Sequence, residues 1–250
     1  MGTDMWEKLK QQFGYDEWAD RSSLRDSLLI WRFFISPPLL AGWLVSRSQR
    51  FVSGSATRTE LVCSRPTAGE DELLRLDIFE CSSLRDAHEQ LLQTLGEFQS
   101  AAIRQMAAGV GDIQFGNGEF TQLFARANLV VMLRNAGKQL VPVAETARAI
   151  DGALTSRPEA SRDQVAPTLT RFLIEEQEAK AGSRVTIGLE ATDPLGRAVW
   201  FKLFASGGQL TVDAEQLIYQ PEAAGTYQIT AFALNENQGV ATRTVSVRVT

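Results

Sequence analysis

The spacing of hydrophobic residues changes once along the 250-residue chain. Before about residue 155, short alternating runs that are typical of strands are mixed with stretches in which apolar residues recur every three or four positions, as on one face of a helix. From Pro167 onward only alternating runs occur, separated by turn residues about every 8 to 12 positions. The pattern predicts an α+β domain followed by an all-β domain.

A polar stretch between the two patterns sets the domain boundaries. Residues 156–166 combine proline, serine and charged residues with little apolar periodicity, which is typical of a linker. We therefore expect an N-terminal helical segment over residues 1–26, an α+β domain over 27–155, this linker, and a β-sandwich over 167–250.

Three helices are predicted in the first part of the chain. Apolar residues recur at helical spacing from Leu84 to Gln99, and Ser83 before them is a suitable N-cap. A second helix runs from Pro142 to Leu154. Residues Met5 to Trp18 form a shorter amphipathic helix, which Gly14 weakens. We expect the two later helices to cover one face of an antiparallel sheet of five or six strands.

The glycine-punctuated stretch from Val110 to Gly137 has two interpretations, a phosphate-binding loop or a hairpin. A phosphate-binding loop follows a strand and opens a helix, whereas here a predicted helix precedes the glycines and strand-like residues follow them. Asn117-Gly118 suits the positive-φ positions of a tight turn, and Asn128 marks a second turn. We predict a hairpin here, and another between residues 60–64 and 72–81.

The segment from Ser27 to Ser46 is long and apolar enough to suggest a membrane span. Arg32 and the central Pro37-Pro38 argue against one, because a charge and a broken helix are both unfavourable in hydrocarbon. We interpret the segment as two strands joined by a proline turn, and expect no integral membrane span. The alternative is a peripheral membrane contact through four aromatic residues, Trp31, Phe33, Phe34 and Trp43.

The charge balance argues against nucleic acid as a partner. The chain has 25 Lys plus Arg against 30 Asp plus Glu, and no basic block with aromatic residues between its charges. Cys63, Cys81 and the single histidine, His88, do not complete a zinc site at a recognised spacing. A hairpin folded about Ala68 would place Cys63 opposite a residue near Leu73, so we expect two buried free thiols rather than a disulfide. No cofactor is predicted.

Several short motifs after Pro167 carry a family resemblance. They are Ala181-Gly182-Ser183, Ala191-Thr192-Asp193 followed by Gly196, Tyr219-Gln220-Pro221, Ala224-Gly225-Thr226-Tyr227 and the final TRTVSVRV strand. Together with the strand spacing, they resemble a bacterial immunoglobulin-like or cadherin-like domain over residues 167–250. The resemblance implies spacing, adhesion or ligand presentation, often outside the cytoplasm.

Cadherin-like relatives bind calcium between successive domains through several acidic residues. Asp193 stands at the matching position and is the single calcium candidate. Pro194 and Leu195 follow where a second acid is expected, and Asn235 stands where those relatives tend to carry aspartate. Because calcium takes about six or more oxygen ligands, we predict no metal site here.

No residue pattern in the chain predicts catalysis. His88 titrates near neutrality and is a candidate general base, but it lies on a predicted helix and no GxSxG motif accompanies it. Asp112 with Glu119 flanks a turn, where acids are commonly solvated, and Glu175 and Glu176 point to opposite faces of a strand. Five aromatic residues could stack on sugars, although each lies in an apolar run: Trp31, Trp43, Trp200, Phe201 and Tyr219.

The leading hypothesis is a non-enzymatic binding or assembly module that docks a protein partner at its sheet edges by strand addition, with the immunoglobulin-like domain as a spacer or second contact. The alternatives are an enzyme or enzyme accessory domain with carboxylate chemistry, and a carbohydrate-binding protein. A row of exposed coplanar aromatics would favour sugar binding, and two carboxylates in a cleft would favour the enzyme. Calcium at Asp193 and carbohydrate are alternative ligands that the sequence does not favour.

Two further expectations concern location and the first domain. The resemblance of the second domain favours the periplasm or cell surface if Met1 is not the native start, and the cytoplasm otherwise. The layout of the first domain loosely resembles small α+β helper modules of the PsbP type. No residue motif accompanies that layout, so no function is carried over from it.

Overall fold

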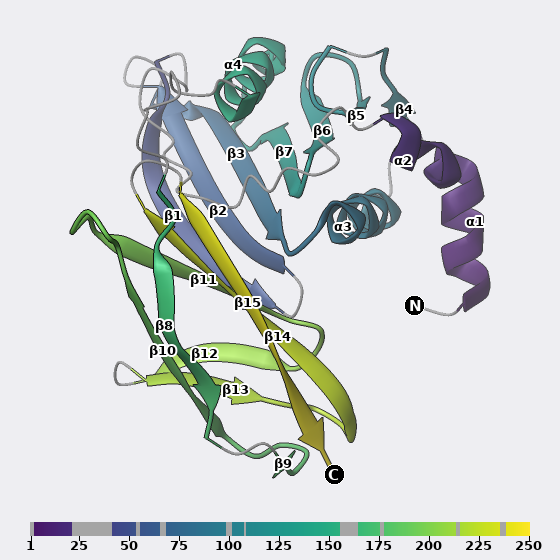
Figure 1. Cartoon of the computed structure of the whole chain (residues 1–250). Coiled ribbons are helices and arrows are strands. Elements are labelled where there is room, and N and C mark those ends of the chain that lie inside the picture. The colour runs from purple at the N-terminus through teal and green to yellow at the C-terminus, as the bar shows by residue number, and fades with distance from the viewer. Residues whose placement is uncertain are drawn as a thin grey trace. The chain divides into compact units, whose positions relative to one another are not determined.

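The computed structural model describes residues 3–21, 42–53, 56–65, 69–98, 102–107, 109–155, 165–175, 178–213, 216–235 and 239–250. Strands predominate among the described residues, helices are few, and most strand pairs are antiparallel, whereas β9 and β15 pair in parallel (Figure 1). The residues form two compact units. The first comprises Met1–Phe51 and Arg58–Ser156, and the second comprises Val52–Thr57 and Arg157–Thr250. The expected segment of two strands around Pro37-Pro38 lies mostly outside the described residues.

The first unit is built on a seven-stranded sheet with the order β1-β2-β3-β7-β6-β5-β4. In its centre β3 pairs with β7 from Leu74 opposite Asn135 to Glu80 opposite Leu129. The sheet has more strands than the five or six expected. Its strands are β1 (Leu44–Ser53), β2 (Ala56–Arg65), β3 (Gly69–Cys81), β4 (Arg104–Gln105), β5 (Ile113–Gly116), β6 (Thr121–Arg126) and β7 (Leu129–Asn135).

The stretch that suggested a phosphate-binding loop forms the predicted hairpin. Strands β5 and β6 pair from Gly116 opposite Gln122 to Ile113 opposite Ala125. Gly118 in the turn between them has a φ of 61°, a conformation that glycine adopts without steric cost. The next turn holds Asn128, as predicted.

Helical segments precede and flank the sheet. The N-terminal segment consists of α1 (Thr3–Phe13), the 3₁₀ turn η1 (Tyr15–Glu17) and α2 (Trp18–Arg21), and Gly14 with a φ of 68° separates α1 from η1. The helix α3 (Leu84–Glu97) begins as predicted, because the Asp86 amide donates to the Ser83 hydroxyl at 3.1 Å. The last helix is α4 (Ala144–Thr155).

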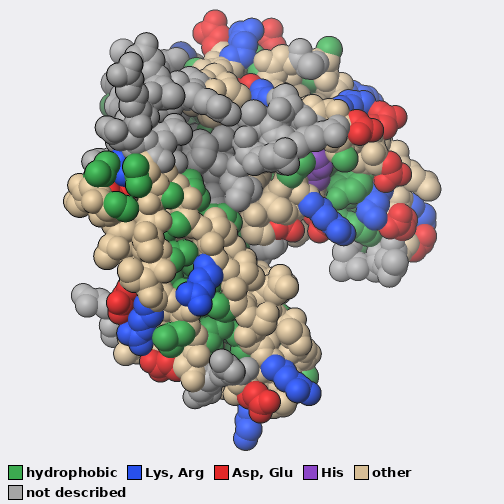
Figure 2. Space-filling model, in the orientation of Figure 1, with side chains coloured by type: hydrophobic (Ala, Val, Ile, Leu, Met, Phe, Trp, Pro, Cys, Tyr) green, Lys and Arg blue, Asp and Glu red, His purple; other side chains and the backbone are tan. Residues whose placement is uncertain are grey.

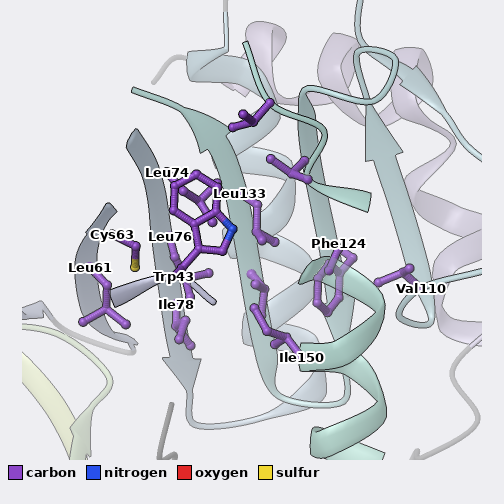
Figure 3. Packing of buried hydrophobic residues seen from close by; sticks show 14 residues of the cluster. Trp43, Leu61, Cys63, Leu74, Leu76, Ile78, Val110, Phe124, Leu133 and Ile150 are labelled. Atoms are coloured by element: carbon purple, nitrogen blue, oxygen red, sulfur yellow. The ribbon is translucent and has the colours of Figure 1, made fainter. Parts of the chain in front are cut away.

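Helices α3 and α4 lie on opposite faces of the sheet, so the expectation that both cover one face is wrong. Ile150 of α4 packs in the core cluster with Phe124 of β6 (Figure 3). Helix α3 packs against Trp18, whose ring contacts that of Phe115. Phe115 is paired with Leu123, so these two side chains point to the same face of the sheet. Phe124, the next residue along β6, points to the other face. Because consecutive strand residues point to opposite faces, α3 and α4 are on different sides.

Coverage of both faces explains the composition of β7. All five residues from Leu129 to Leu133 are buried. A strand covered on one side alternates apolar and polar residues, whereas a strand covered on both sides is apolar throughout. The core on the α4 side contains residues of β2, β3, β6, β7 and α4 together with Trp43 (Figure 3).

The second unit consists of two four-stranded sheets that pack face to face as a sandwich. Their orders are β12-β13-β10-β8 and β11-β14-β15-β9. The shared core joins Phe172, Ile187 and Tyr219 of the first sheet to Ile229 and Val247 of the second. The strands are β8 (Thr168–Ile174), β9 (Glu178–Ala179), β10 (Val185–Thr192), β11 (Val199–Ala205), β12 (Gln209–Asp213), β13 (Gln216–Gln220), β14 (Gly225–Asn235) and β15 (Val240–Val249).

Candidate binding surface

Charged side chains line one face of β2 and β3 in the first unit. Along β3, Leu74 and Leu76 point into the α4-side core, so Arg75 and Asp77 point to the opposite face. The alternation along β2 has the same result, because Leu61 and Cys63 join that core while Arg58 and Glu60 face Arg75 and Asp77. We call Arg58, Glu60, Arg75, Asp77 and the neighbouring Arg134 the arginine cluster.

Two carboxylates hold two of these arginines in fixed positions. Asp77 is fully buried and its Oδ1 accepts from Arg58 Nε at 2.9 Å and Nη2 at 2.6 Å. Its Oδ2 accepts from Arg75 Nε at 2.9 Å, and Glu60 Oε2 accepts from Arg75 Nη2 at 2.6 Å. The Arg58 guanidinium also lies 5.5 Å from the centre of the Phe79 ring. Arg58 and Arg75 are therefore preorganised by charge-assisted hydrogen bonds.

Arg134 adds a positive charge that the cluster does not balance. It stands directly opposite Arg75 in the β3–β7 pairing and forms no ion pair with the residues that the structure describes. Burial lowers the pKa of Arg134, and the positive charge of Arg75 lowers it further. Like charges directly opposite each other on neighbouring strands are destabilising. The environment of Arg134 therefore disfavours the charge that it carries.

Among the described strands, β1 forms one edge of the same sheet (Figure 1). Every residue from Leu44 to Gln49 is exposed, including two apolar side chains, Leu44 at 49% and Val45 at 44%. Since consecutive side chains point to opposite faces, neither face of this part of β1 is covered. Arg47 reaches Glu60 at 3.9 Å, which connects the edge strand to the arginine cluster.

A weak signal for the arginine cluster is present in the sequence, but it does not identify the cluster. Arg75 and Asp77 alternate with leucines in ELLRLDIFE, and Arg134 ends the apolar run LVVMLR. Charged residues at alternate positions of an otherwise apolar strand indicate one apolar and one charged face. Which strands would bring these charges together depends on the pairing of β2, β3 and β7, which is not a local property.

His88 lies on α3, and its side chain is buried in the first unit. Its side chain is 5% exposed, its ring meets that of Trp18 edge to face, and its Nε2 has no hydrogen-bond partner among the described residues. Burial lowers the pKa of His88, and the negative charge of Asp112 opposes that shift. The buried environment of His88 therefore favours the neutral imidazole.

A shallow pocket of about 370 Å³ lies beside His88, between α3 and the N-terminal helices. Tyr15 and Ala19 line it together with charged residues of α1, η1 and α3. One of these, Arg85, is paired with Glu89 at 3.0 Å along the helix. Figure 2 shows acidic and basic side chains interspersed around these helices. Such paired charges are typical of a solvated helix surface and do not single out a ligand.

Asp112 is not the solvated acid expected at a turn. Its side chain is 1% exposed, and it accepts from Arg126 Nη1 at 2.6 Å and from the Ala127 amide at 2.8 Å. Arg126 also donates through Nε and Nη2 to the two oxygens of Asp151, each at 2.7 Å. Burial lowers the pKa of Arg126, but these two carboxylates outweigh it and the net shift is upward. Glu119 is exposed and takes no part in this group.

Asp193, the calcium candidate, lies in a closed hydrogen-bonded group of the second unit. Its Oδ1 accepts from Arg197 Nε at 2.9 Å and its Oδ2 accepts from Asn235 Nδ2 at 2.7 Å. The hydrogen bond from Arg197 is the main reason that the pKa of Asp193 lies well below its usual range. The guanidinium supplies the positive charge at these oxygens. Over the described ranges, no three His, Cys, Asp or Glu side chains gather in a metal-binding arrangement.

The remaining candidate residues are dispersed. Trp43 and Tyr219 are core residues, 1% and 0% exposed. Trp43 is therefore not available for a peripheral membrane contact. Trp200 and Phe201 are half-buried neighbours on β11, and Glu175 is exposed beyond the end of β8. Glu176 and Trp31, Phe33 and Phe34 lie outside the described residues.

Both cysteines are buried free thiols, as expected from the sequence. Burial raises the pKa of Cys63 to about 11 and also raises that of Cys81. A thiol with a raised pKa is a poor nucleophile, because the thiolate is the reactive form. Neither cysteine therefore adds to the chemistry of the surface.

Within the described part of the chain, no helix is both long enough and apolar enough to cross a membrane. No protein-family model matches the chain, and neither does any curated protein sequence.

One solved structure with some similarity is an extracellular domain of a one-component system from B. thetaiotaomicron. It is 10% identical to this chain, with a TM-score of 0.20, and the match covers 76% of this chain and 29% of the other. A polysaccharide lyase is 11% identical and covers 88% of this chain and 37% of its own at a TM-score of 0.20. The chain thus spans well under half of these proteins. At this TM-score the similarity assigns neither fold nor function.

Proposed function

We propose that this protein is a non-enzymatic binding module that docks a partner protein by strand addition at β1. The observation that carries the proposal is the exposure of both faces of this edge strand from Leu44 to Gln49. An edge strand offers unpaired main-chain donors and acceptors, and an added strand would satisfy them. Exposed side chains on both faces leave room for the side chains of the incoming strand.

The choice of β1 over the other edge of the sheet follows from length. Strand β1 has ten residues, whereas β4 at the opposite edge has only two, Arg104 and Gln105. Leu44 and Val45 are consecutive, so they offer an apolar contact on each face of the strand. Arg47, which follows them, is the kind of charged residue that keeps an edge strand from pairing indiscriminately. Strand β1 therefore begins with two apolar side chains and continues with a charged one, and a partner strand has to match both.

We infer further that the first unit is an α+β domain and that the second is an immunoglobulin-like domain that serves as a spacer or a second contact. Immunoglobulin-like domains have one sheet of four strands and one of three, and the orders β12-β13-β10-β8 and β11-β14-β15 agree with that arrangement. The short strand β9 extends the second sheet by pairing in parallel with β15. Tyr227, near the start of β14, donates its hydroxyl to the Ala223 carbonyl at 3.0 Å, as in the tyrosine corner of such domains. The same resemblance is the basis for proposing a periplasmic or cell-surface location.

The two alternative functions have less support from the residues that would carry them. Sugar binding by a row of aromatics would need Trp43 and Tyr219 at the surface, and both are buried. Carboxylate chemistry would need Asp112 to be accessible, and Arg126 and the Ala127 amide occupy its oxygens. The binding module is therefore the function that we retain.

Affinity capture from the native source followed by amide hydrogen exchange tests the proposal. The full chain is compared with Val45→Lys, which places a charge on the edge strand, and with Leu140→Lys, a matched change at an exposed apolar residue outside the sheet. We expect wild type and Leu140→Lys to retain the same partner and Val45→Lys to lose it. In the complex, exchange at residues 44–49 should slow.

Two results would count against docking at β1. One is a partner that Val45→Lys retains as well as the wild-type chain does. The other is protection from exchange that appears elsewhere while residues 44–49 exchange as fast as in the free protein. Capture without protection of β1 would place the contact on another surface.

A further inference from the structure

The arginine cluster lies on β2, β3 and β7, and Arg47 of the edge strand β1 reaches it at Glu60. Arg58 and Arg75 share two carboxylates, Asp77 and Glu60, so those four charges balance. Arg134 adds a positive charge in excess of these four. The chain as a whole has a formal net charge of −5, so an unbalanced, half-buried arginine is not a consequence of a generally basic surface.

The two carboxylates of the cluster already pair with Arg58 and Arg75. Asp77 accepts hydrogen bonds from Arg58 through Oδ1 and from Arg75 through Oδ2, and Oε2 of Glu60 accepts from Arg75. Arg134 also stands opposite Arg75 across the β3–β7 pair. An uncompensated charge in a partly buried position is unfavourable unless an ion of opposite sign joins it.

The cluster also has the rigidity that a binding site requires. Hydrogen bonds to Asp77 and Glu60 fix the Arg75 guanidinium, and Asp77 and the Phe79 ring fix that of Arg58. Guanidinium groups present planar sets of donors that match the oxygens of a carboxylate or phosphate. Donors held in place before binding lose little conformational freedom when the ligand arrives.

We propose that Arg134, with Arg75 and Arg58 beside it, binds the oxyanion group of an anionic ligand on this face of the sheet. A carboxylate or a phosphate group would lie between Arg134 and Arg75 and relieve the repulsion across β3 and β7. Strand addition at β1 is not needed for this site, because β2 and β3 separate β1 from β7. The variant Val45→Lys leaves the three arginines unchanged, and Arg134→Gln leaves β1 unchanged, so the two proposals can fail independently.

Isothermal titration calorimetry with two probes, inorganic phosphate and succinate, tests the site on the full chain at constant ionic strength. We expect saturable binding of at least one probe to the wild-type chain and an affinity at least about tenfold lower for Arg134→Gln. Arg243→Gln removes the same charge from an exposed position of β15 and should bind as the wild type does. Binding of phosphate alone would identify a phosphate-bearing ligand, and binding of succinate alone a carboxylate-bearing one.

Thermal unfolding without added anion provides an independent measurement. If Arg134 is uncompensated, Arg134→Gln should unfold at the same temperature as the wild-type chain or higher. A clear decrease in the unfolding temperature would mean that a carboxylate of this chain pairs with Arg134, and would overturn the proposal. Failure of both probes to bind the wild-type chain, or equal binding by Arg134→Gln, would overturn it as well.

Discussion

Two charged groups in the first unit differ in how completely their charges are paired. In one, Arg126 donates to Asp112 and Asp151 through three nitrogens, and the side chains of all three residues are at most 13% exposed. In the arginine cluster, by contrast, Arg134 faces Arg75 with no carboxylate of its own among the described residues. The first group is closed and joins β6 to α4, whereas the second is open to an additional anion. Both groups contain buried charges, so burial does not distinguish them. Whether every charge has a partner within the group is what distinguishes the structural group from the proposed binding site.

Breaking the closed group should have the largest effect. Arg126→Gln would leave Asp112 and Asp151 buried without a counter-charge, so we expect the free energy of unfolding to fall by about 3 to 5 kcal/mol. Urea unfolding followed by tryptophan fluorescence measures it. The control Arg243→Gln should change that free energy by less than about 0.5 kcal/mol. A loss under about 1 kcal/mol for Arg126→Gln would contradict a structural role for the group.

Removing the buried carboxylate of the arginine cluster should have a smaller effect. Asp77→Asn keeps the shape of the side chain but removes the charge that holds Arg58 and Arg75, so we expect a loss of about 2 kcal/mol in the free energy of unfolding. An Asp77→Asn chain as stable as the wild type would mean that other contacts position the two arginines.

The pH dependence of stability should show a smaller effect from His88. Burial lowers its pKa in the folded state below the unfolded value of about 6.5, so the unfolded chain binds more protons. The contribution of the neutral His88 side chain to the free energy of unfolding is complete above about pH 6.5. It is lost as the pH falls through that value toward the pKa of His88 in the folded state. Asp112 opposes the loss only in part, because Arg126 already pairs with it.

Comparison of His88→Leu with the wild-type chain isolates this contribution. The free energy of unfolding, measured from about pH 7.5 to pH 5, should fall less steeply with acidification in His88→Leu than in the wild-type chain. Tyr15 and Trp18 stay in place beside the substituted residue, so the apolar packing is largely kept. Identical slopes for the two proteins would show that His88 has the same pKa in the folded and the unfolded state.

Features with local signals could be predicted from the sequence. The Ser83 cap and the leucine spacing placed α3, and Asn117-Gly118 placed the β5–β6 turn, because each signal lies within a few residues of the structure that it forms. Which face of the sheet each helix covers could not be predicted in this way. The amphipathic pattern shows which side of a helix is apolar, but not which side of the sheet the chain reaches.

Features of the site that depend on contacts distant in sequence were missed or misread. The turn after Asp112 predicts a solvated side chain, yet Arg126 and the amide of Ala127 in the later β6–β7 turn engage its oxygens. The arginine cluster needs β2, β3 and β7 side by side, and Arg58 and Arg134 are far apart in sequence. Whether the two faces of β1 are exposed likewise depends on where distant helices and strands pack, which the sequence of β1 itself does not show.

Amide hydrogen exchange on the full chain without any partner tests most directly whether β1 is an available edge. We expect fast exchange over residues 44–49 at the amides that point away from β2, and slow exchange throughout β3 and β7, where strands pair on both sides. Exchange throughout β1 as slow as in β3 would show that the edge is already covered, and would contradict docking by strand addition.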